Sequence, residues 1–129
     1  MHEGRCLCGG IRYTIDGPIG DIDLCHCSYC RRASGSAFAS NATIARADFS
    51  FVAGSDLLRE YEASPKKHRS FCSRCGSPIY ARHEAAPEVL RIRLGTVDGD
   101  PGSRPTGHYD VASKAPWYTI TDDLPQKPD

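Results

Sequence analysis

Seven cysteines fall into three groups along the chain, at spacings typical of metal ligation. The central group has the pattern C-x-C-x-x-C and consists of Cys25, Cys27 and Cys30. A free cysteine packs as a small apolar side chain, and its reactivity usually explains why it is kept. Core packing does not require three thiols so close together, whereas a chain that turns around a metal ion returns a sulfur every few residues. The remaining cysteines form two outer pairs, Cys6/Cys8 and Cys72/Cys75.

The cysteine count indicates one closed zinc site and one open zinc site. Structural zinc takes about four protein ligands, whereas catalytic zinc takes about three and keeps one position for water or substrate. The two outer pairs can supply the closed site and the central group the open one, although the central group could instead combine with Cys6 or Cys8. Glycine placement favours the first partition. Gly9 and Gly76 directly follow the last sulfur of each outer pair, where a metal-binding turn needs a left-handed backbone.

Disulfide bonding is the alternative use of these thiols. An odd number of cysteines leaves one unpaired, and C-x-C is too tight a spacing for an easy bridge. The N-terminal segment 1–5 lacks the apolar run of a secretory signal, so we expect a cytoplasmic, reducing location. Metal ligation is the favoured use of clustered cysteines in that compartment.

Length and charge narrow the function classes. A chain of 129 residues makes one domain that buries roughly two-thirds of its unfolded surface. The 16 basic and 16 acidic residues cancel, which argues against a nucleic-acid partner bound through phosphate contacts. There is no membrane segment, internal repeat or coiled coil. We expect a single domain over 1–123 and a polar, poorly ordered tail over 124–129.

Short alternating stretches predict a mostly antiparallel β fold, because no segment has a helical period of ten or more residues. A short helical turn is expected over 28–35, and a glycine- and proline-rich loop over 98–105. The segments 69–71 and 78–82 lead into and out of the Cys72/Cys75 pair. Strands are expected over 11–15, 21–24, 38–44, 49–52, 57–61, 89–94 and 108–111.

The central histidine, His26, lies between two candidate ligands. Successive side chains of an extended segment point to opposite faces, so Cys25 and Cys27 would share a side while His26 points away. We therefore expect His26 to lie behind the ligands or at the surface rather than to bind the metal. Histidine as a residue type can exchange protons near neutral pH, so His68, His83 and His108 are candidate acid–base groups, but each alone is more often a structural or surface histidine.

Three motifs carry a resemblance to a known family. They read Gly4-x-Cys6-x-Cys8-Gly9-x-Ile11-x-Tyr13, Cys25-His26-Cys27-x-x-Cys30-Arg31 and Phe71-Cys72-x-x-Cys75-Gly76-x-Pro78. In this order they resemble the glutathione-dependent formaldehyde-activating enzyme family, which also includes centromere protein V. Two later motifs, Pro105-x-x-His108 and Ala115-Pro-Trp117, extend the resemblance over most of the chain. One C-x-x-C alone would be weak, whereas three cysteine groups in this order are specific.

The resemblance implies a β-tent fold of several small antiparallel sheets with two zinc ions per chain. It also implies condensation of glutathione with formaldehyde to S-(hydroxymethyl)glutathione, a carbon–sulfur lyase reaction in reverse. The small-molecule partners would then be a thiol and an aldehyde. The implied structural zinc ligands are Cys6, Cys8, Cys72 and Cys75. The implied catalytic zinc ligands are Cys25, Cys27 and Cys30.

The charge of the open site is consistent with thiol chemistry. Three thiolates around Zn²⁺ leave a net charge of about −1, so the site acidifies bound water poorly compared with a neutral-histidine site. A soft, thiolate-rich site is better suited to accept a fourth sulfur, as hemithioacetal formation or cleavage requires. Arg31 and Arg32 would offset the negative charge and bind a substrate carboxylate. The alternative interpretation is that both arginines are solvated surface residues without a binding role.

Two other function classes stay open at this stage. One is a non-catalytic zinc module that binds a protein, as β-tent domains elsewhere do. The other is a thiol-based redox enzyme, because β-tent methionine sulfoxide reductases also combine a zinc site with a reactive cysteine. Two metals per chain would favour the lyase, and one metal with a low-pKa thiol would favour the redox enzyme.

Overall fold

The computed structural model describes residues 1–129 and contains ten strands, one α-helix and four short 3-10 turns. The fold is mostly β, as the sequence predicts. No helix is both long and apolar enough to cross a membrane. The strands are β1 (His2–Arg5), β2 (Arg12–Ile15), β3 (Ile22–Cys25), β4 (Ala39–Ala45), β5 (Phe49–Ala53), β6 (Leu58–Ser64), β7 (Lys67–Cys72), β8 (Pro78–His83), β9 (Val89–Arg93) and β10 (Pro105–Tyr109). The helix is α1 (Ser28–Ser34), and the 3-10 turns are Arg46–Asp48, Ser55–Leu57, Leu94–Thr96 and Val111–Ser113.

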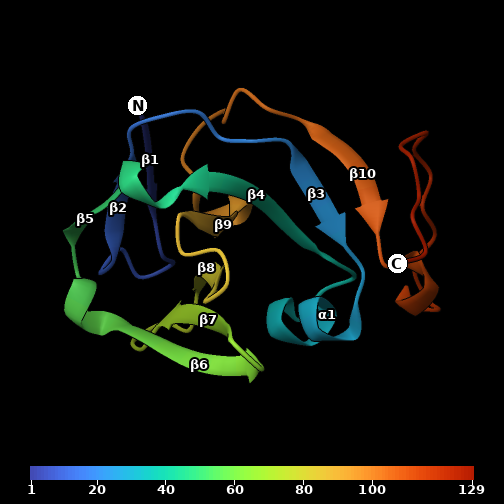
Figure 1. Cartoon of the computed structure of the whole chain (residues 1–129), viewed down its shortest axis with the longest axis horizontal. Helices are drawn as coiled ribbons and strands as arrows, with labels where there is room; N and C mark the ends of the chain where they lie inside the picture. The colour runs from blue at the N-terminus through green and yellow to red at the C-terminus, as the bar shows by residue number, and fades with distance from the viewer.

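The strands form two sheets (Figure 1). The smaller sheet has three antiparallel strands in the order β1-β2-β5. The larger has seven strands in the order β10-β3-β4-β9-β8-β7-β6, and only the β10/β3 pair is parallel. In Figure 1, α1 lies beside the end of β3 and the start of β4, and the C-terminal segment lies beyond β10.

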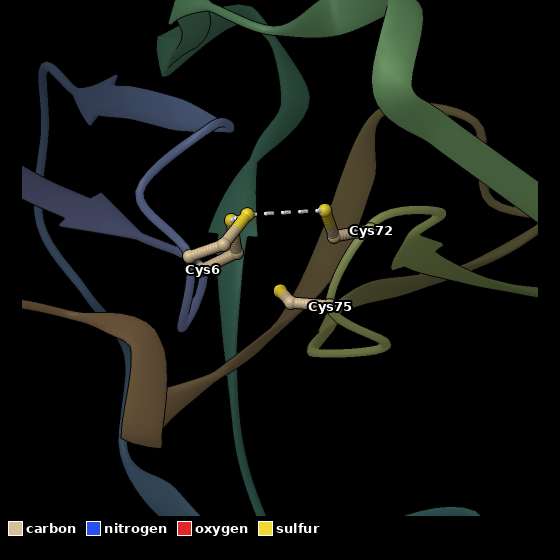
Figure 2. A group of neighbouring side chains, drawn as sticks. Cys6, Cys72 and Cys75 are labelled. Carbon is tan, nitrogen blue, oxygen red and sulfur yellow. Dashed lines mark hydrogen bonds between the residues drawn. The ribbon is translucent and has the colours of Figure 1, made fainter.

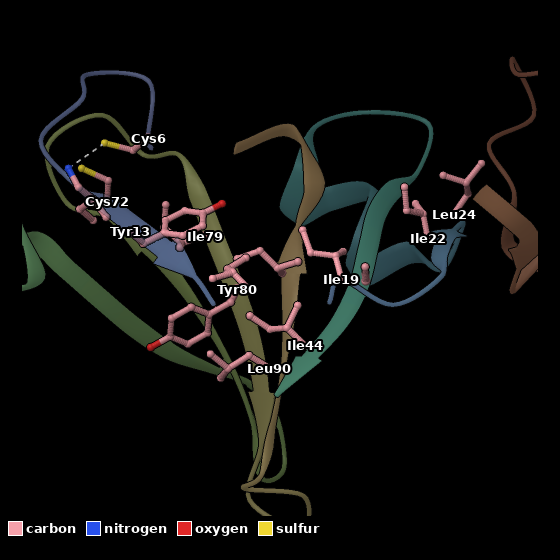
Figure 3. Close-up of a cluster of buried hydrophobic side chains, with 14 residues drawn as sticks. Cys6, Tyr13, Ile19, Ile22, Leu24, Ile44, Cys72, Ile79, Tyr80 and Leu90 are labelled. Atoms are coloured by element: carbon pink, nitrogen blue, oxygen red, sulfur yellow. Dashed lines mark hydrogen bonds between the residues drawn. The ribbon is translucent and has the colours of Figure 1, made fainter. Parts of the chain in front are cut away.

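The apolar core lies on one face of the seven-stranded sheet and extends to the small sheet (Figure 3). Leu90 and Ile92 of β9 are two residues apart, so they point to the same face, and each is at most 2% exposed. Ile92 pairs across strands with Ala42 of β4 and Tyr80 of β8. Full burial of one such side chain stabilises the fold by about 1.5–3 kcal/mol.

The opposite face of the same sheet is polar and basic. It consists of the residues that alternate with the core positions. Strand pairing aligns Asp23, Asn41 and Arg93 in one row, and places Ala81 between Arg69 and Arg91 in the next.

Two segments differ from the sequence-based expectation at the edges of the fold. Strand β1 was not expected, because its sequence is polar and contains a glycine, but it pairs with β2 along its whole length. The last strand begins at Pro105, inside the predicted loop, and ends at Tyr109, while Val111 lies in a 3-10 turn. The parallel pairing of β10 with β3 explains the difference, since the partner sets the strand ends.

The C-terminal tail is bonded to the domain rather than loose. The amide of His108 donates to the Pro125 carbonyl at 2.9 Å, and the amide of Lys127 donates to the His108 carbonyl at 2.9 Å. The amide of Val111 donates to the Lys127 carbonyl at 3.0 Å. The tail thus runs alongside β10, where its backbone groups find partners that the sequence pattern does not show.

Candidate metal centres

Four cysteines from both halves of the chain form one compact cluster. Cys6 and Cys8 lie in the loop between β1 and β2, whereas Cys72 ends β7 and Cys75 lies in the turn before β8. Figure 2 shows Cys6, Cys72 and Cys75 pointing toward one another from facing loops. All four sulfur atoms lie within 4.8 Å of one another. The measured Sγ–Sγ distances are 3.5 Å for Cys6–Cys8 and 3.9 Å for Cys8–Cys72.

The size of this four-cysteine cluster matches a zinc ion. With Zn–S bonds of about 2.3 Å, sulfurs at the corners of a tetrahedron lie about 3.8 Å apart. The two measured distances bracket that value. The donor set therefore fits a closed tetrathiolate zinc site. It is also the pairing that the glycine pattern favours over the alternative partitions.

The two glycines behind this prediction adopt the expected conformation. Gly9 has φ +75° and Gly76 has φ +81°, both in the left-handed region. The amide of Gly9 donates to the Cys6 carbonyl at 3.1 Å, and the amide of Gly76 donates to the Cys72 carbonyl at 2.7 Å. These matched turns direct both sulfurs of each pair inward, and the prediction of left-handed turns is confirmed.

Donors around the four-cysteine cluster favour thiolates. The backbone amides of Ile11 and Gly10 donate to the Cys6 and Cys8 sulfurs at 3.3 and 3.4 Å. The guanidinium of Arg74 donates from Nε to the Cys8 sulfur at 3.4 Å and lowers the pKa of that thiol. Burial has the opposite effect on Cys6, whose pKa is raised. A bound cation would stabilise the charge on all the sulfurs.

The three central cysteines form a second cluster at the start of α1. Cys25 ends β3, Cys27 caps the helix and Cys30 lies within its first turn. The amide of Cys30 donates to the Cys27 sulfur at 3.3 Å, and the three sulfurs lie within 4.8 Å of one another. No histidine, carboxylate or fourth cysteine completes this cluster at the same spacing. The donor set therefore fits a metal ion with one position left for another ligand.

Charge is distributed unevenly within the three-cysteine cluster. The hydrogen bond from Cys25, reinforced by one from Arg69, lowers the pKa of the Cys30 thiol to about 5 against the effect of burial. The same bond to Cys30, together with burial, raises the pKa of Cys25. Cys25 also donates to Oδ2 of Asp110 at 3.4 Å. One sulfur thus carries the negative charge most readily, and that sulfur contacts a guanidinium.

Two cavities meet at Cys30. The first, of about 150 Å³, lies between α1 and the strands β7, β8 and β9, and the second, of about 230 Å³, lies over the basic face. Both are lined by Cys30 and Arg93. The first cavity is also lined by Arg69, Tyr61, Phe71 and Tyr80. The second cavity is also lined by Cys25, Asn41, Lys67, Arg91 and Asp110.

The predicted anion-binding arginines lie elsewhere. Arg31 and Arg32 line neither of the two cavities at Cys30. Arg32 is exposed and lines a shallow hollow on the outer side of α1 together with Tyr29 and Tyr61. A carboxylate-binding role for these two arginines stays a prediction.

Sequence reasoning missed the cationic residues that do line the cavities, Arg69 and Arg93. The available signal was the Lys67-x-Arg69 alternation that leads into Cys72, which places both cations on one face of β7.

His26 is buried rather than at the surface, and it is not part of the cysteine cluster. Its ring is 0% exposed, and its Nε2 lies 2.8 Å from Nδ1 of His108. The side chain thus points away from the sulfurs, as the strand alternation predicts. The neighbour that holds it comes from β10, which the sequence pattern does not reveal.

The fold and the two clusters together define a class: β proteins with a four-cysteine and a three-cysteine cluster, each of which could bind a metal ion. The model of the family described as "Glutathione-dependent formaldehyde-activating enzyme" matches residues 1–113. The chain belongs to this family.

Similar proteins carry related names. A Halomonas elongata protein, named as a candidate glutathione-dependent formaldehyde-activating enzyme, is 32% identical over 93% of this chain and 81% of its own length. A Fusarium vanettenii protein with the same name is 30% identical over a matched region that covers 62% of this chain and 44% of that relative. A crystal structure of a Rhodobacter sphaeroides protein superposes with a TM-score of 0.65 at 25% identity, covering 81% of this chain and 99% of that protein.

Proposed function

We propose that the chain is a zinc-dependent carbon–sulfur lyase that forms and cleaves thiol–aldehyde adducts. The model reaction is the combination of glutathione with formaldehyde to give S-(hydroxymethyl)glutathione. The observation that carries the proposal is the three-cysteine cluster, which lacks a fourth protein ligand and borders two cavities at Cys30. Family membership and the name of the Halomonas elongata relative support the choice of reaction.

Each cysteine cluster has its own part in this proposal. Cys6, Cys8, Cys72 and Cys75 would hold a structural zinc that joins the β1–β2 loop to the β7–β8 turn. Cys25, Cys27 and Cys30 would hold the catalytic zinc. When bound at the open site, zinc supplies Lewis acidity and lowers the pKa of a thiol that joins its ligands.

The residues around the open cluster hold it in shape and balance its charge. The Cys27 sulfur accepts the Cys30 amide, which fixes the spacing of these two donors at the helix start. Arg69 donates from Nη2 to the Cys30 sulfur at 3.7 Å, so a positive group compensates the thiolates on the cavity side. Tyr61 and Phe71, whose ring centroids lie 6.1 Å apart, give the first cavity an aromatic wall, which would exclude water from the substrate chain.

The proposed reaction balances without an oxidant or reductant. The thiol sulfur bonds to the carbonyl carbon of the aldehyde, the S–H bond breaks, and the proton ends on the former carbonyl oxygen. Cleavage is the reverse. A redox enzyme would instead need a free reactive cysteine and an external reductant to regenerate it. The two alternatives therefore differ in metal content as well as in chemistry.

The test combines metal analysis with exchange kinetics. The wild type should contain two zinc ions per chain and should accelerate exchange between glutathione and its formaldehyde adduct, as followed by NMR exchange spectroscopy. Uncatalysed exchange is rapid, so rates are compared with a protein-free sample and with Cys30→Ser. That variant should contain one zinc and show only the protein-free rate. Equal acceleration by wild type and Cys30→Ser, or a single zinc with a reactive low-pKa thiol in the wild type, would contradict the proposal.

A further inference from the structure

Two arginines beside the open cluster are buried without a carboxylate partner. Arg69 is 5% exposed and Arg93 is 9% exposed. Neither takes part in any ion pair of the structure. The only side-chain acceptor of Arg69 is the Cys30 sulfur, and its Nε is buried without any partner. The only side-chain acceptor of Arg93 is the amide oxygen of Asn41.

Buried charges of this kind are costly when they lack a counter-ion. A neighbour on the same sheet face shows the usual solution, because Arg91 pairs with Asp23 at 2.5 Å. The two unpaired arginines also repel each other. Burial and the charge of Arg69 lower the pKa of Arg93 to about 10. An anion between them would relieve both effects.

The first cavity offers the space for that anion. It is lined by both arginines and by Cys30, and no aspartate or glutamate lines it. The acidic residues near the cluster, including Asp110, line the second cavity instead. The three thiolates with a divalent ion carry a net charge of about −1, which compensates one guanidinium and leaves the other without a partner. The surplus positive charge thus faces the cavity in which a substrate would lie.

We infer that Arg69 and Arg93 form an anion subsite that binds a carboxylate of the substrate in the first cavity, next to the open cysteine cluster. This inference rests on the proposed function and deepens it, since it assigns specificity-determining residues and a substrate class. Guanidinium groups present paired donors that match a carboxylate. Tyr61 and Phe71 line the same cavity and can contact the chain that joins the carboxylate to the reacting group.

The carboxylate can belong to the thiol or to the aldehyde, and paired probes separate these sources. The thiol pair is 3-mercaptopropionate and 2-mercaptoethanol, which differ mainly in the carboxylate. The aldehyde pair is glyoxylate and formaldehyde. Dissociation constants are measured on the cobalt-substituted protein, by its absorption spectrum for thiols and by calorimetry for aldehydes in the presence of 2-mercaptoethanol. These readouts do not depend on turnover.

The wild type should bind the carboxylate-bearing member of at least one pair about tenfold more tightly or more, as expected for charge-assisted hydrogen bonds. Arg69→Gln and Arg93→Gln should each reduce that preference to near unity. Arg93→Gln removes a buried charge that has no counter-ion, so this variant should leave the melting temperature of the ligand-free protein unchanged or raised. The matched control is Arg59→Gln, which removes an exposed arginine of β6 that lines neither cavity. It should retain the wild-type preference.

The outcomes separate the subsite from the lyase proposal. Tighter binding of 3-mercaptopropionate than of 2-mercaptoethanol would place the carboxylate on the thiol. Tighter binding of glyoxylate than of formaldehyde would place it on the aldehyde. Either result supports the subsite. Equal binding within both pairs by the wild type overturns the subsite and leaves the lyase proposal standing. A preference that survives in both glutamine variants also overturns it. If no thiol changes the cobalt spectrum while Arg69-dependent binding of glyoxylate persists, the subsite stands and the lyase proposal fails.

Discussion

The rings of His26 and His108 form a buried hydrogen bond, with Nε2 of His26 2.8 Å from Nδ1 of His108. On its other side, Nε2 of His108 lies 3.0 Å from Oδ2 of Asp122. A carboxylate only accepts hydrogen bonds, so His108 carries its proton on Nε2. Nδ1 of a neutral His108 is then the acceptor, and His26 donates from Nε2. These hydrogen bonds link the loop between β3 and α1, which carries part of the three-cysteine cluster, to β10 and to the segment that follows β10.

Replacement of His108 by phenylalanine should destabilise the protein. Phenylalanine fills most of the space of the imidazole but leaves the Nε2–H of His26 buried without an acceptor. An unsatisfied buried donor costs about 1–3 kcal/mol. Urea unfolding of the zinc-loaded protein measures the loss. A change below about 0.5 kcal/mol would show that the histidine pair does not contribute to stability.

The contact between His108 and Asp122 can be tested with a matched pair of variants. Asp122→Asn removes the charge that His108 contacts, whereas Asp123→Asn removes the adjacent exposed charge, which has no hydrogen bond in the structure. The first variant should melt at a lower temperature than the second, measured side by side by calorimetry. Equal melting temperatures would mean that His108 is held by its packing alone.

The left-handed glycines of the four-cysteine cluster lead to a further prediction. Gly76→Ala should destabilise the protein by roughly 1–2 kcal/mol, because a Cβ disfavours φ +81° even where nothing else is near. Gly95→Ala is the control, since Gly95 has no positive φ and an added Cβ there also meets nothing within 4 Å. Denaturant unfolding with parallel zinc analysis checks both. Similar stability of the two variants would remove the argument that the turn geometry needs glycine.

The cysteine clusters could be predicted from sequence because their signal is local. Cysteine spacing and the glycine after Cys8 and Cys75 are set within a few residues, so the sequence alone favours the partition into four and three cysteines. Most strands were also predictable, since alternation over four to seven residues reports a half-buried strand.

The anion-binding residues could not be assigned in the same way. Arg69 and Arg93 occupy ordinary alternating positions on β7 and β9, and only the order of strands in the large sheet brings them to Cys30. An arginine in a strand is usually solvated, and its burial depends on what covers that face. The sequence favours Arg31 because it adjoins Cys30, but adjacency in a helix does not direct a side chain into a cavity.

Loss of one ligand of the four-cysteine cluster should damage the whole fold. Cys72 is 0% exposed and belongs to the apolar core, and its partners Cys6 and Cys8 lie at the opposite end of the sequence. A metal ion bound there would therefore close a long loop, and structural zinc binding is coupled to folding free energy. Cys72→Ser should lose one zinc and either express poorly or melt much lower. A variant with native zinc content and an unchanged melting temperature would refute the structural assignment.

Metal exchange should distinguish the two clusters in the wild type. Under the proposed assignment, three sulfurs would hold the ion at the three-cysteine cluster, and the cavities at Cys30 would give a chelator access to it. Four sulfurs would hold the other ion, and two of the four cysteines, Cys6 and Cys72, are buried. A mild chelator should therefore remove one equivalent of zinc first, while circular dichroism stays native.

The site that releases this first equivalent is identified by Cys30→Ser. This variant should lack the fast-exchanging zinc, retain the slow one and show only a modest fall in melting temperature, because the remaining metal still joins the β1–β2 loop to the β7–β8 turn. Cobalt added back to the depleted wild type should enter the open cluster, and its absorption spectrum should change when a thiol is added, as a fourth sulfur joins the ligands. Simultaneous loss of both zinc ions together with the fold, or a cobalt spectrum that thiols leave unchanged, would show that the three-cysteine cluster is not an open metal site.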